Sequence, residues 1–315
     1  MKRWIVRKGD GETALAIVAK MGGDARAFGE GRVFVGKRRA RDGEERVREG
    51  DEVRLGEENG RERGRAKKNP TKTTGDRVVV VAREGGIVAA IKPAGIPTVP
   101  DHAGSSHAFV SLVADEIGVA VEEMRVVSRL DREVSGIILF ATSAEAEADL
   151  KELRERGEYQ RRYVAIARGA ASLRSSGTWD EAIGDGKDAR HRAVGGKNAK
   201  ASTTKYRVVG QANGFTMLAV EPVTGRTHQI RVHSAHAGAP LLGDRDYGGP
   251  TRITLESGSV VSLARIALHA IEVTLLGKVL GGADVPEELS KVWRELGGDA
   301  EAWNTALRCS IDESS

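Results

Sequence analysis

The sequence has almost no cysteine and no long apolar run. Cys309 is the single cysteine among 315 residues, which excludes an internal disulfide and a cysteine-cluster metal site. No stretch approaches the roughly 20 apolar residues that span a bilayer. No long apolar core follows the basic start Met1–Arg3, which argues against a secretory signal. These absences predict a cytoplasmic protein that does not associate with membranes.

Several motifs of known enzyme classes are also absent. Neither glycine-rich phosphate fingerprint is present, which disfavours nucleoside-triphosphate chemistry. Ser128 lies near Asp131, but without a Gly-x-Ser-x-Gly turn or an assigned histidine base it does not make a hydrolase triad. His228, His233 and His236 raise the question of a metal, but no acidic residue lies at a spacing typical of zinc hydrolases. We therefore expect no metal site, and a metal-dependent hydrolase is a minor alternative.

Positive charge is concentrated at the N-terminal end of the chain. Residues 1–77 hold 21 Lys and Arg against 14 Asp and Glu, whereas the remaining residues hold 28 against 31. The positive excess behind the formal net charge of +4 therefore lies in the first quarter. A basic segment on a near-neutral body predicts an anionic partner, most simply nucleic acid. A solvated tail is the alternative.

Residues 1–55 have the apolar spacing of a small folded module rather than of a tail. One expected helical face carries Ala14, Ile17, Val18 and Met21. Short strands are expected within Gly31–Gly36 and Val47–Leu55. Residues 56–77 are mostly Gly, Glu, Arg, Lys, Asn and Thr, a composition that predicts a flexible basic linker.

Residues 78–315 read as many short strands and fewer helices. Strands are expected at 78–82, 87–91, 135–141, 159–167, 203–209 and 215–221. Helices are expected from a cap at Ser105 or Ser106 to Gly118, from a Thr142/Glu145 capping box to Gly157, and over Pro286–Leu296. Strands outnumber helices and hairpin-length links are common. We therefore expect an α+β fold, with a mixed, largely antiparallel sheet and flanking helices.

The densest set of functional groups is the run Thr224–His233, which holds two guanidinium groups, two imidazoles, an amide and hydroxyls. The turn residues Pro222 and Gly225 and the β-branched spacing that follows predict a strand here. In such a strand His228 and His233 would face opposite sides. So many donors beside a turn suit a pocket for phosphate and a carboxylate. A strand made polar for solubility is the alternative.

Two further segments place a carboxylate and an aromatic ring beside arginines. In one loop, Asp131 lies between Arg129 and Arg132. It is either a turn residue whose charge balances its neighbours or an ionised nucleophile or base. In a later strand, Arg161 and Tyr163 are two residues apart, so both side chains face one side. They form either an amphipathic edge strand or a ring that stacks on a base beside a cation for phosphate.

Taken in order over residues 78–315, these segments resemble the RluA-type pseudouridine synthases, which isomerise uridine in structured RNA. The resemblance is carried by Lys92–Gly95, by Arg129–Asp131 with Ser135 and Gly136, by Arg161 with Tyr163, by Thr224–His233 followed by Gly238–Pro240, Gly243, Asp244, Tyr247 and Gly248, and by Arg265 with Leu268–Ala270. Residues 1–55 resemble the αL-type RNA-binding module that often precedes this catalytic domain. The resemblance implies RNA as the partner, a pseudouridine synthase fold at 78–315 and no cofactor. Nothing in the sequence demands more than a monomer.

Four positions depart from the family's pattern. Ser128 stands where a histidine is usual, Val134 replaces a threonine, and Arg161 replaces a lysine. Thr274–Gly277 occupies the place of a customary His-Pro. None of these departures removes a group assigned to catalysis, but they bear on which RNA is the target.

The resemblance assigns Asp131 as the essential carboxylate. It implies that Tyr163 stacks on the uracil and assists a late proton removal, and Arg231, with Arg226 second, is the candidate for the ion pair that keeps Asp131 ionised. Substrate contacts are expected from Arg129, Arg226, Thr227, His228, Gln229, Lys92 and Arg161. The implied target is a uridine in large-subunit ribosomal RNA, with transfer RNA second. An inactive RNA-binding or ribosome-assembly factor on the same fold is the alternative.

Overall fold

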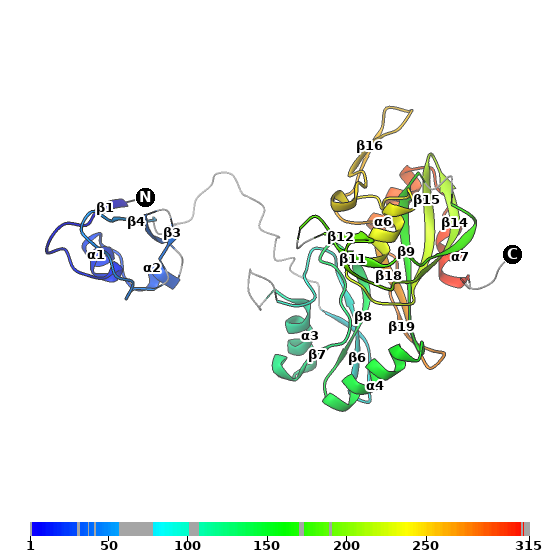
Figure 1. The fold of residues 1–315 in the computed structure, drawn as a ribbon, viewed down its shortest axis with the longest axis horizontal. Helices are drawn as coiled ribbons and strands as arrows, with labels where there is room; N and C mark the ends of the chain where they lie inside the picture. Colours follow the sequence, from blue (N-terminus) through cyan, green and yellow to red (C-terminus); the bar gives the residue numbers. More distant parts are fainter. Residues whose placement is uncertain are drawn as a thin grey trace. The chain divides into compact units, whose positions relative to one another are not determined.

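The computed structural model describes residues 2–29, 32–36, 38–40, 42–56, 78–100, 107–169, 173–188, 191–309 and 311. The chain divides into two units, Met1–Thr74 and Gly75–Ser315 (Figure 1). Apart from Gly56, the expected linker lies outside the described residues, and so does the expected helix cap at Ser105 or Ser106.

The N-terminal unit is a small antiparallel sheet with two helices. Its strands are β1 (Lys2–Ile5), β2 (Val33–Val35), β3 (Arg38–Arg39) and β4 (Glu52–Leu55), in the spatial order β1-β4-β2-β3. Helix α1 (Ala14–Lys20) begins after Thr13, whose hydroxyl accepts from the N–H of Ala16, and α2 is Arg26–Gly29. The predicted helical face is confirmed, because Ile17 and Val18 are buried with Val53 of β4. This apolar contact holds the helix on the sheet.

The larger unit is built on a ten-stranded sheet. Its strands are β5 (Val79–Glu84), β6 (Ile87–Lys92), β7 (Arg125–Val126), β8 (Ser135–Ala141), β9 (Tyr159–Arg168), β10 (Ser176–Trp179), β14 (Thr204–Ala212), β15 (Phe215–Pro222), β18 (Leu268–Leu275) and β19 (Lys278–Gly282). The order is β10-β14-β15-β9-β18-β8-β6-β5, with β19 beside β18 and β7 beside β8. Among the described strands, β8 and β18 pair in parallel and the others pair antiparallel. The predicted mixed, largely antiparallel sheet is confirmed.

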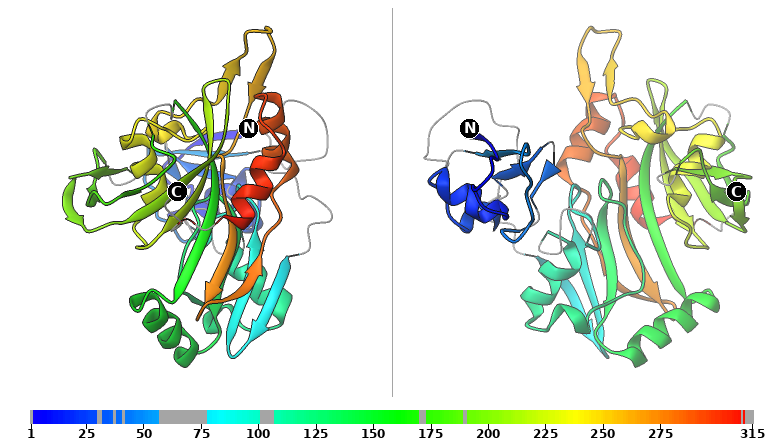
Figure 2. Two further views of the ribbon diagram at one scale, coloured as in Figure 1. Left: turned by 90° about the vertical axis from the view of Figure 1, so that its right-hand side faces the viewer. Right: turned by 60° about the vertical axis from the view of Figure 1, so that its left-hand side comes forward.

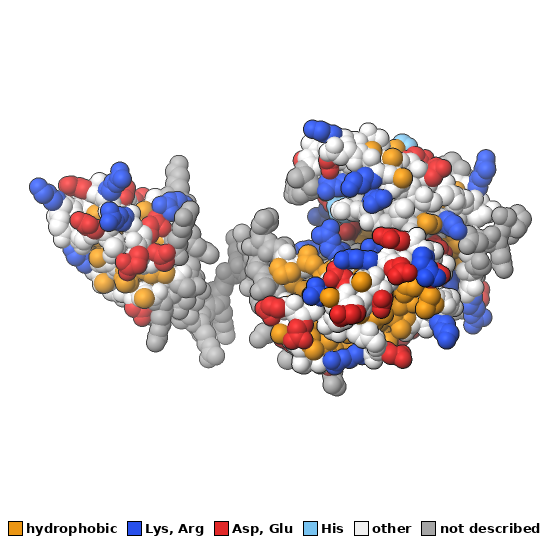
Figure 3. Space-filling view, turned by 60° about the horizontal axis from the view of Figure 1, so that its bottom comes forward, with side chains coloured by type: hydrophobic (Ala, Val, Ile, Leu, Met, Phe, Trp, Pro, Cys, Tyr) orange, Lys and Arg blue, Asp and Glu red, His pale blue; other side chains and the backbone are white. Residues whose placement is uncertain are grey.

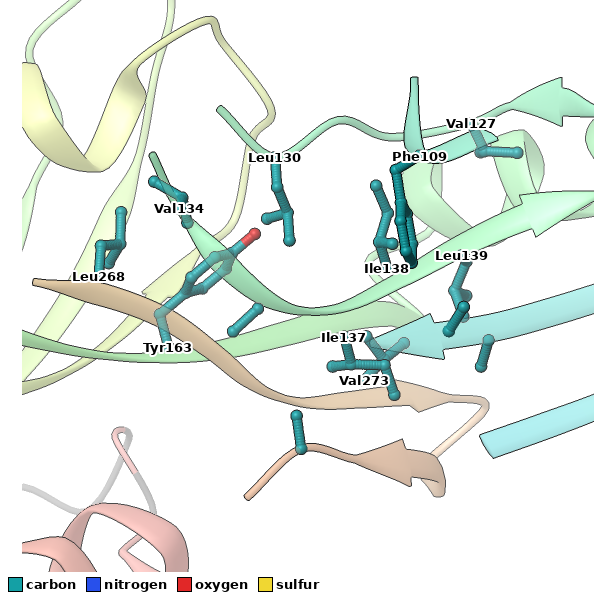
Figure 4. Packing of buried hydrophobic residues seen from close by; sticks show 14 of the residues in the cluster. Phe109, Val127, Leu130, Val134, Ile137, Ile138, Leu139, Tyr163, Leu268 and Val273 are labelled. Carbon is teal, nitrogen blue, oxygen red and sulfur yellow. The ribbon is translucent and has the colours of Figure 1, made fainter. Parts of the chain in front are cut away.

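Helices cover the two halves of this sheet (Figure 2). Helices α3 (Phe109–Ile117) and α4 (Ala144–Glu155) accompany the half that holds β8, whereas α6 (Glu287–Glu295) and α7 (Glu301–Arg308) accompany β14 and β15. Phe109 packs against Phe140 of β8 with ring centroids 6.1 Å apart, and Figure 4 shows it beside Ile138. Every residue of β8 is buried, as its continuous apolar run suggests. Alternate residues of β9 and β15 belong to two apolar clusters, Tyr163 and Leu218 to the one that contains α3 and α4, and Val164 and Met217 to the one that contains α6 and α7. The two cores therefore lie on opposite faces of these strands.

Smaller elements complete this unit. A three-stranded sheet contains β11 (Ile183–Asp185), β12 (Arg192–Val194) and β13 (Lys197–Lys200), and a hairpin contains β16 (Arg252–Thr254) and β17 (Val260–Ser262). Within the described residues the 3-10 turns are η1 (Val121–Glu123) and η3 (Arg245–Tyr247). None of the helices in the described ranges is long and apolar enough to cross a membrane.

The predicted capping box of α4 is displaced by one residue. Ser143, not Thr142, is the N-cap, and its hydroxyl accepts from the N–H of Ala146 at 3.1 Å. Thr142 instead donates to the carbonyl of Gly86 at 3.2 Å. Thr142 is therefore bound to the turn before β6 and does not cap the helix. The helix ends before Gly157, which has a φ of 73° as a helix-ending glycine should.

The expectation of a strand within Thr224–His233 is wrong, because the chain forms helix α5 (Gln229–His236) there. His228 adopts a left-handed conformation, with φ 58° and ψ 19°, and turns the chain from the end of β15 into the helix. The side chain of Gln229 then accepts from the N–H of Arg226 at 2.9 Å and stabilises this turn. Ile230 and Val232 are buried in the helix all the same, so tertiary contacts override their β-propensity.

Candidate active site

A cavity of about 550 Å³ lies where the loop before β8 meets the turn between β15 and α5. It is lined by nine of the ten predicted site residues: Asp131, Tyr163, Arg231, Arg129, Arg226, Thr227, His228, Gln229 and Arg161. These residues come from three segments distant in sequence. The structure therefore brings the predicted residues to one place, with Lys92 as the exception.

The loop that carries Asp131 is held on both sides of that residue. Thr98 donates its hydroxyl to the carbonyl of Leu130 at 2.7 Å and accepts from the Leu130 N–H at 3.1 Å. The N–H of Gly95 donates to the carbonyl of Arg132 at 2.7 Å. Both neighbours of Asp131 are thus bound to the turn that follows β6. Such support fixes the direction of a catalytic side chain.

Lys92 does not reach the cavity and does not fit the role of a substrate contact. It is fully buried, and its ammonium group donates to the carbonyls of Pro93 at 2.8 Å, Ile96 at 2.7 Å and Arg132 at 3.2 Å. These bonds use all three of its protons. Burial lowers the pKa of Lys92 to about 7. Lys92 therefore holds the turn and the Asp131 loop together from inside the protein.

Arg231 connects α5 to three carboxylates. Its Nη1 donates to Asp131 Oδ2 at 2.9 Å, its Nε and Nη2 bind the two oxygens of Asp244 at 2.7 and 2.8 Å, and Nη2 also binds Asp246 at 2.9 Å. Burial opposes the charge of Arg231, but the hydrogen bonds and charges of Asp244 and Asp131 outweigh it and raise its pKa. The two-pronged contact with Asp244 fixes the guanidinium plane. The remaining Nη1 is thereby directed at Asp131.

Sequence reasoning gave no role to Asp244 and Asp246. The segment Gly243–Gly248 belongs to the motifs that carry the family resemblance, so the sequence marks it as important. The sequence around it does not show that its acidic residues bind Arg231. Gly243 has a φ of 83°, and a Cβ there would lie 1.8 Å from the carbonyl oxygen of Arg265. Only glycine therefore fits at the bend that brings Asp244 to Arg231.

His228 presents one ring nitrogen to the cavity. The backbone N–H of Arg192 donates to the hydroxyl oxygen of Tyr247 at 2.9 Å, and that hydroxyl lies 2.8 Å from His228 Nδ1. Because the Tyr247 oxygen already accepts from Arg192, the hydroxyl proton is free to be donated to Nδ1, which leaves the proton of His228 on Nε2. Nε2 lies 3.8 Å from Asp131 Oδ2. Burial lowers the pKa of His228 against the opposing charge of Asp131, so the ring is a neutral donor.

Tyr163 forms an apolar wall of the cavity. Its ring projects from β9, is 6% exposed and belongs to the same cluster as Leu130, Val134 and Leu268. Figure 4 shows its hydroxyl directed toward Leu130. Burial raises the pKa of Tyr163 above its ordinary value. The ring is therefore a neutral phenol with an aromatic surface suited to stacking.

The other predicted contacts divide into supporting and accessible groups. Gln229 is fully bonded: its oxygen accepts from Thr224 and the N–H of Arg226, and its nitrogen donates to Thr203 and Thr204. Its amide supports the turn rather than offering free donors. Arg129, Arg226 and Thr227 are exposed at the edge of the cavity, where a substrate can reach them.

The histidines do not form a metal site with one another. Both ring nitrogens of His233 are bonded, to Thr204 Oγ1 and to the carbonyl of Glu181, each at 2.9 Å. Within the described ranges no group of three or more His, Cys, Asp or Glu is arranged to hold a metal ion. This geometry does not favour the metal-dependent hydrolase.

The family model for RNA pseudouridylate synthases matches residues 86–236, a range that contains Asp131, Tyr163 and Arg231. The chain is 32% identical over 199 residues to the dual-specificity RNA pseudouridine synthase RluA of Haemophilus ducreyi, covering 62% of this chain and 85% of that protein. The chain belongs to the RNA pseudouridylate synthase family. It is also 33% identical over 223 residues to the ribosomal large subunit pseudouridine synthase D of Xanthomonas campestris, covering 66% of each chain.

Solved structures of human proteins have the same fold as this chain. Human RNA pseudouridylate synthase domain containing 1 superposes with a TM-score of 0.56 at 22% identity, covering 75% of this chain and 97% of that one. Human RNA pseudouridylate synthase domain containing 4 superposes with a TM-score of 0.54 at 18% identity, covering 70% of this chain and 93% of that one. The chain covers 66%, 58% and 54% of the length of three curated relatives, that is, between about half and two thirds of each.

Proposed function

We propose that the protein is an RNA pseudouridine synthase that isomerises specific uridines through Asp131. The observation that carries this proposal is the ion pair between Arg231 and Asp131, which lies in a cavity whose volume of about 550 Å³ is typical of ligand sites. The reaction breaks the bond between ribose and a ring nitrogen and forms one to a ring carbon. It needs a positioned carboxylate, a base removed from its stack and exclusion of water while the base rotates.

Three features of the cavity support this proposal. Asp131 is held by its loop and by Arg231, and Tyr163 with Leu130 and Leu268 provides an apolar wall for a flat ring. Because burial favours the neutral phenol of Tyr163, stacking suits this residue better than accepting a proton. His228 Nε2 is placed to donate to an oxygen of the target nucleotide beside Asp131.

The charge around the cavity favours a polyanionic substrate. Six arginines line it against one carboxylate, Asp131. Figure 3 shows Lys and Arg side chains gathered beside a hollow in the larger unit. Several relatives carry the name ribosomal large subunit pseudouridine synthase D, and one carries the name dual-specificity RNA pseudouridine synthase. We therefore place large-subunit ribosomal RNA first as the substrate and transfer RNA second, for a monomeric cytoplasmic enzyme with an αL-type RNA-binding module at residues 1–55.

The Asp131→Asn variant tests the role of the carboxylate. We expect it to abolish tritium release from RNA labelled at C5 of uridine and to leave RNA affinity within about threefold of the wild type, because the amide cannot replace the carboxylate but fills the same space. Asp115→Asn on the exposed face of α3 is the matched control and should remain active. Turnover by the Asp131→Asn variant would remove Asp131 from the mechanism.

The alternative, an RNA-binding or ribosome-assembly factor without activity, makes a different prediction. The wild-type protein would then bind ribosomal RNA but release no tritium from labelled ribosomal RNA or transfer RNA. Mapping pseudouridines in RNA from cells with and without this protein identifies the site directly. Identical maps would favour the binding factor.

A further inference from the structure

One wall of the cavity carries two arginines side by side. Arg154 of α4 and Arg161 of β9 both line the cavity, and their guanidinium carbons lie 5.3 and 5.6 Å from the centroid of the Tyr159 ring. Ser128 lines the same wall, and its hydroxyl lies 3.1 Å from that of Tyr159. The aromatic ring thus holds two positive charges at one edge of the site.

Neither of these guanidinium groups has an acidic partner among the described residues. Arg154 donates to the carbonyl of Val127 at 2.6 Å, and Arg161 donates to the carbonyls of Thr224 at 2.9 Å and Pro222 at 3.3 Å. The Nε atoms of both are buried and have no hydrogen-bond partner. Carbonyl contacts orient the two groups but leave their charge uncompensated.

Several other cations on the same two elements are neutralised. Lys151 of α4 and Arg156 at its C-cap pair with glutamates, and Arg162 of β9 pairs with Glu272 at 3.2 Å. Arg168 at the exposed end of β9 has no acidic partner among the described residues either, but it does not line this cavity, so Arg154 and Arg161 are the unpaired arginines of these elements that face it. Burial and the charge of Arg161 both lower the pKa of Arg154. Like charges held together without a counter-ion are stabilised when an anion binds between them.

We propose that Arg154 and Arg161 bind a phosphodiester of the RNA chain next to the everted uridine. This inference rests on the proposed function, since the ligand is the backbone of the RNA substrate. Guanidinium groups are well suited to phosphate oxygens. Ser128 is small where the related family usually has a histidine, so it leaves this wall open to the backbone.

The test uses the full-length protein and the variant Arg154→Gln, with Arg156→Gln at the C-cap of the same helix as the matched control. We expect Arg154→Gln to weaken RNA binding and raise KM about tenfold, with kcat within about threefold of the wild type. The slope of log affinity against log salt should fall by about 0.7 to 0.9, the effect of one phosphate contact. Arg156→Gln should match the wild type, because Arg156 is exposed and paired with glutamates.

A neutral methylphosphonate placed singly along the RNA identifies the contact. Wild-type affinity should fall at one linkage beside the target uridine, and Arg154→Gln should show no further loss at that linkage. Equal losses for both proteins at every linkage, or an unchanged salt slope in Arg154→Gln, would overturn the inference. Arg161→Gln, which removes the other charge of the pair, gives the same comparison if Arg154→Gln does not fold. A wild-type protein without activity on RNA would instead refute the proposed function.

Discussion

Arg231 Nη1 lies 2.9 Å from Asp131 Oδ2, although the two residues are 100 positions apart in the sequence. The guanidinium group that makes this contact is itself held by the two oxygens of Asp244, which is 1% exposed. The position of the proposed catalytic carboxylate therefore depends on a second, buried carboxylate behind Arg231. The consequences of this arrangement and of its supports can be measured.

Replacing Arg231 by lysine should abolish most of the activity. Lysine keeps the charge but cannot bind Asp244 with two parallel bonds while also reaching Asp131. We expect kcat to fall by at least about 100-fold and the free energy of unfolding to fall by about 3 kcal/mol, because Asp244 loses its partner in the interior. Tritium release and urea unfolding check both effects. Exposed Arg245→Lys is the control, and equal behaviour of the two variants would contradict this account.

Thr98→Val should lower activity without changing RNA affinity. The substitution removes both hydrogen bonds to Leu130 and leaves the Asp131 loop free to shift. We expect a loss of about 1 to 3 kcal/mol in stability and a lower kcat at saturating RNA. Thr142→Val, which removes a single bond to Gly86 outside the cavity, should retain its kcat. A Thr98→Val protein with wild-type kcat would show that the loop does not need this support.

Tyr247→Phe tests the assignment of the proton on His228. Phenylalanine keeps the ring that Arg231 covers at 4.9 Å but loses the hydroxyl that binds Nδ1. With that bond gone, His228 can place its proton on either nitrogen, and we expect kcat to fall about tenfold while KM stays similar. The measurement is a double-mutant cycle with His228→Asn. Independent, additive losses in the two variants would show that Tyr247 does not act through His228.

Stability should depend on pH through His269. This residue is buried beside Ser135, and burial together with Arg265 lowers its pKa from 6.5 to about 4. Below pH 6.5 the unfolded chain takes up a proton at this site that the folded protein does not accept until about pH 4. The contribution of His269 is therefore complete above pH 6.5 and is lost as the pH falls, at up to about 1.4 kcal/mol per pH unit.

The unfolding free energies of the wild type and of His269→Gln isolate this effect. Their difference should change between pH 6.5 and 4 and stay constant above pH 7, because all other titrating groups are shared. Parallel curves over the whole range would show that His269 does not titrate differently in the folded protein.

Deleting residues 1–77 should weaken RNA binding and leave the larger unit folded. The deletion removes the positive excess of the chain, so the salt dependence of binding should become shallower. Fluorescence anisotropy across salt concentrations checks this, and circular dichroism monitors the fold. An unchanged salt dependence would count against the proposed RNA-binding role of the N-terminal unit.

The sequence alone determined the family, the sheet-rich architecture and the identity of the main site residues. The buried run of β8, the helix of Phe109 and the ordered motifs around Asp131, Tyr163 and Arg231 are local patterns, and local patterns can be read without coordinates. That is why nine of the ten predicted site residues line one cavity.

Only the tertiary structure decided what several of these residues do. Thr224–His233 has strand-forming residues, but the bonds of Gln229 to Thr203 and Thr204 and the burial of Ile230 make part of it a helix. Lys92 is a cation in a recognised motif, yet its three carbonyl partners lie inside the protein, one of them 40 residues away. Partners distant in the chain determine burial and hydrogen bonding, and no spacing along the sequence specifies them.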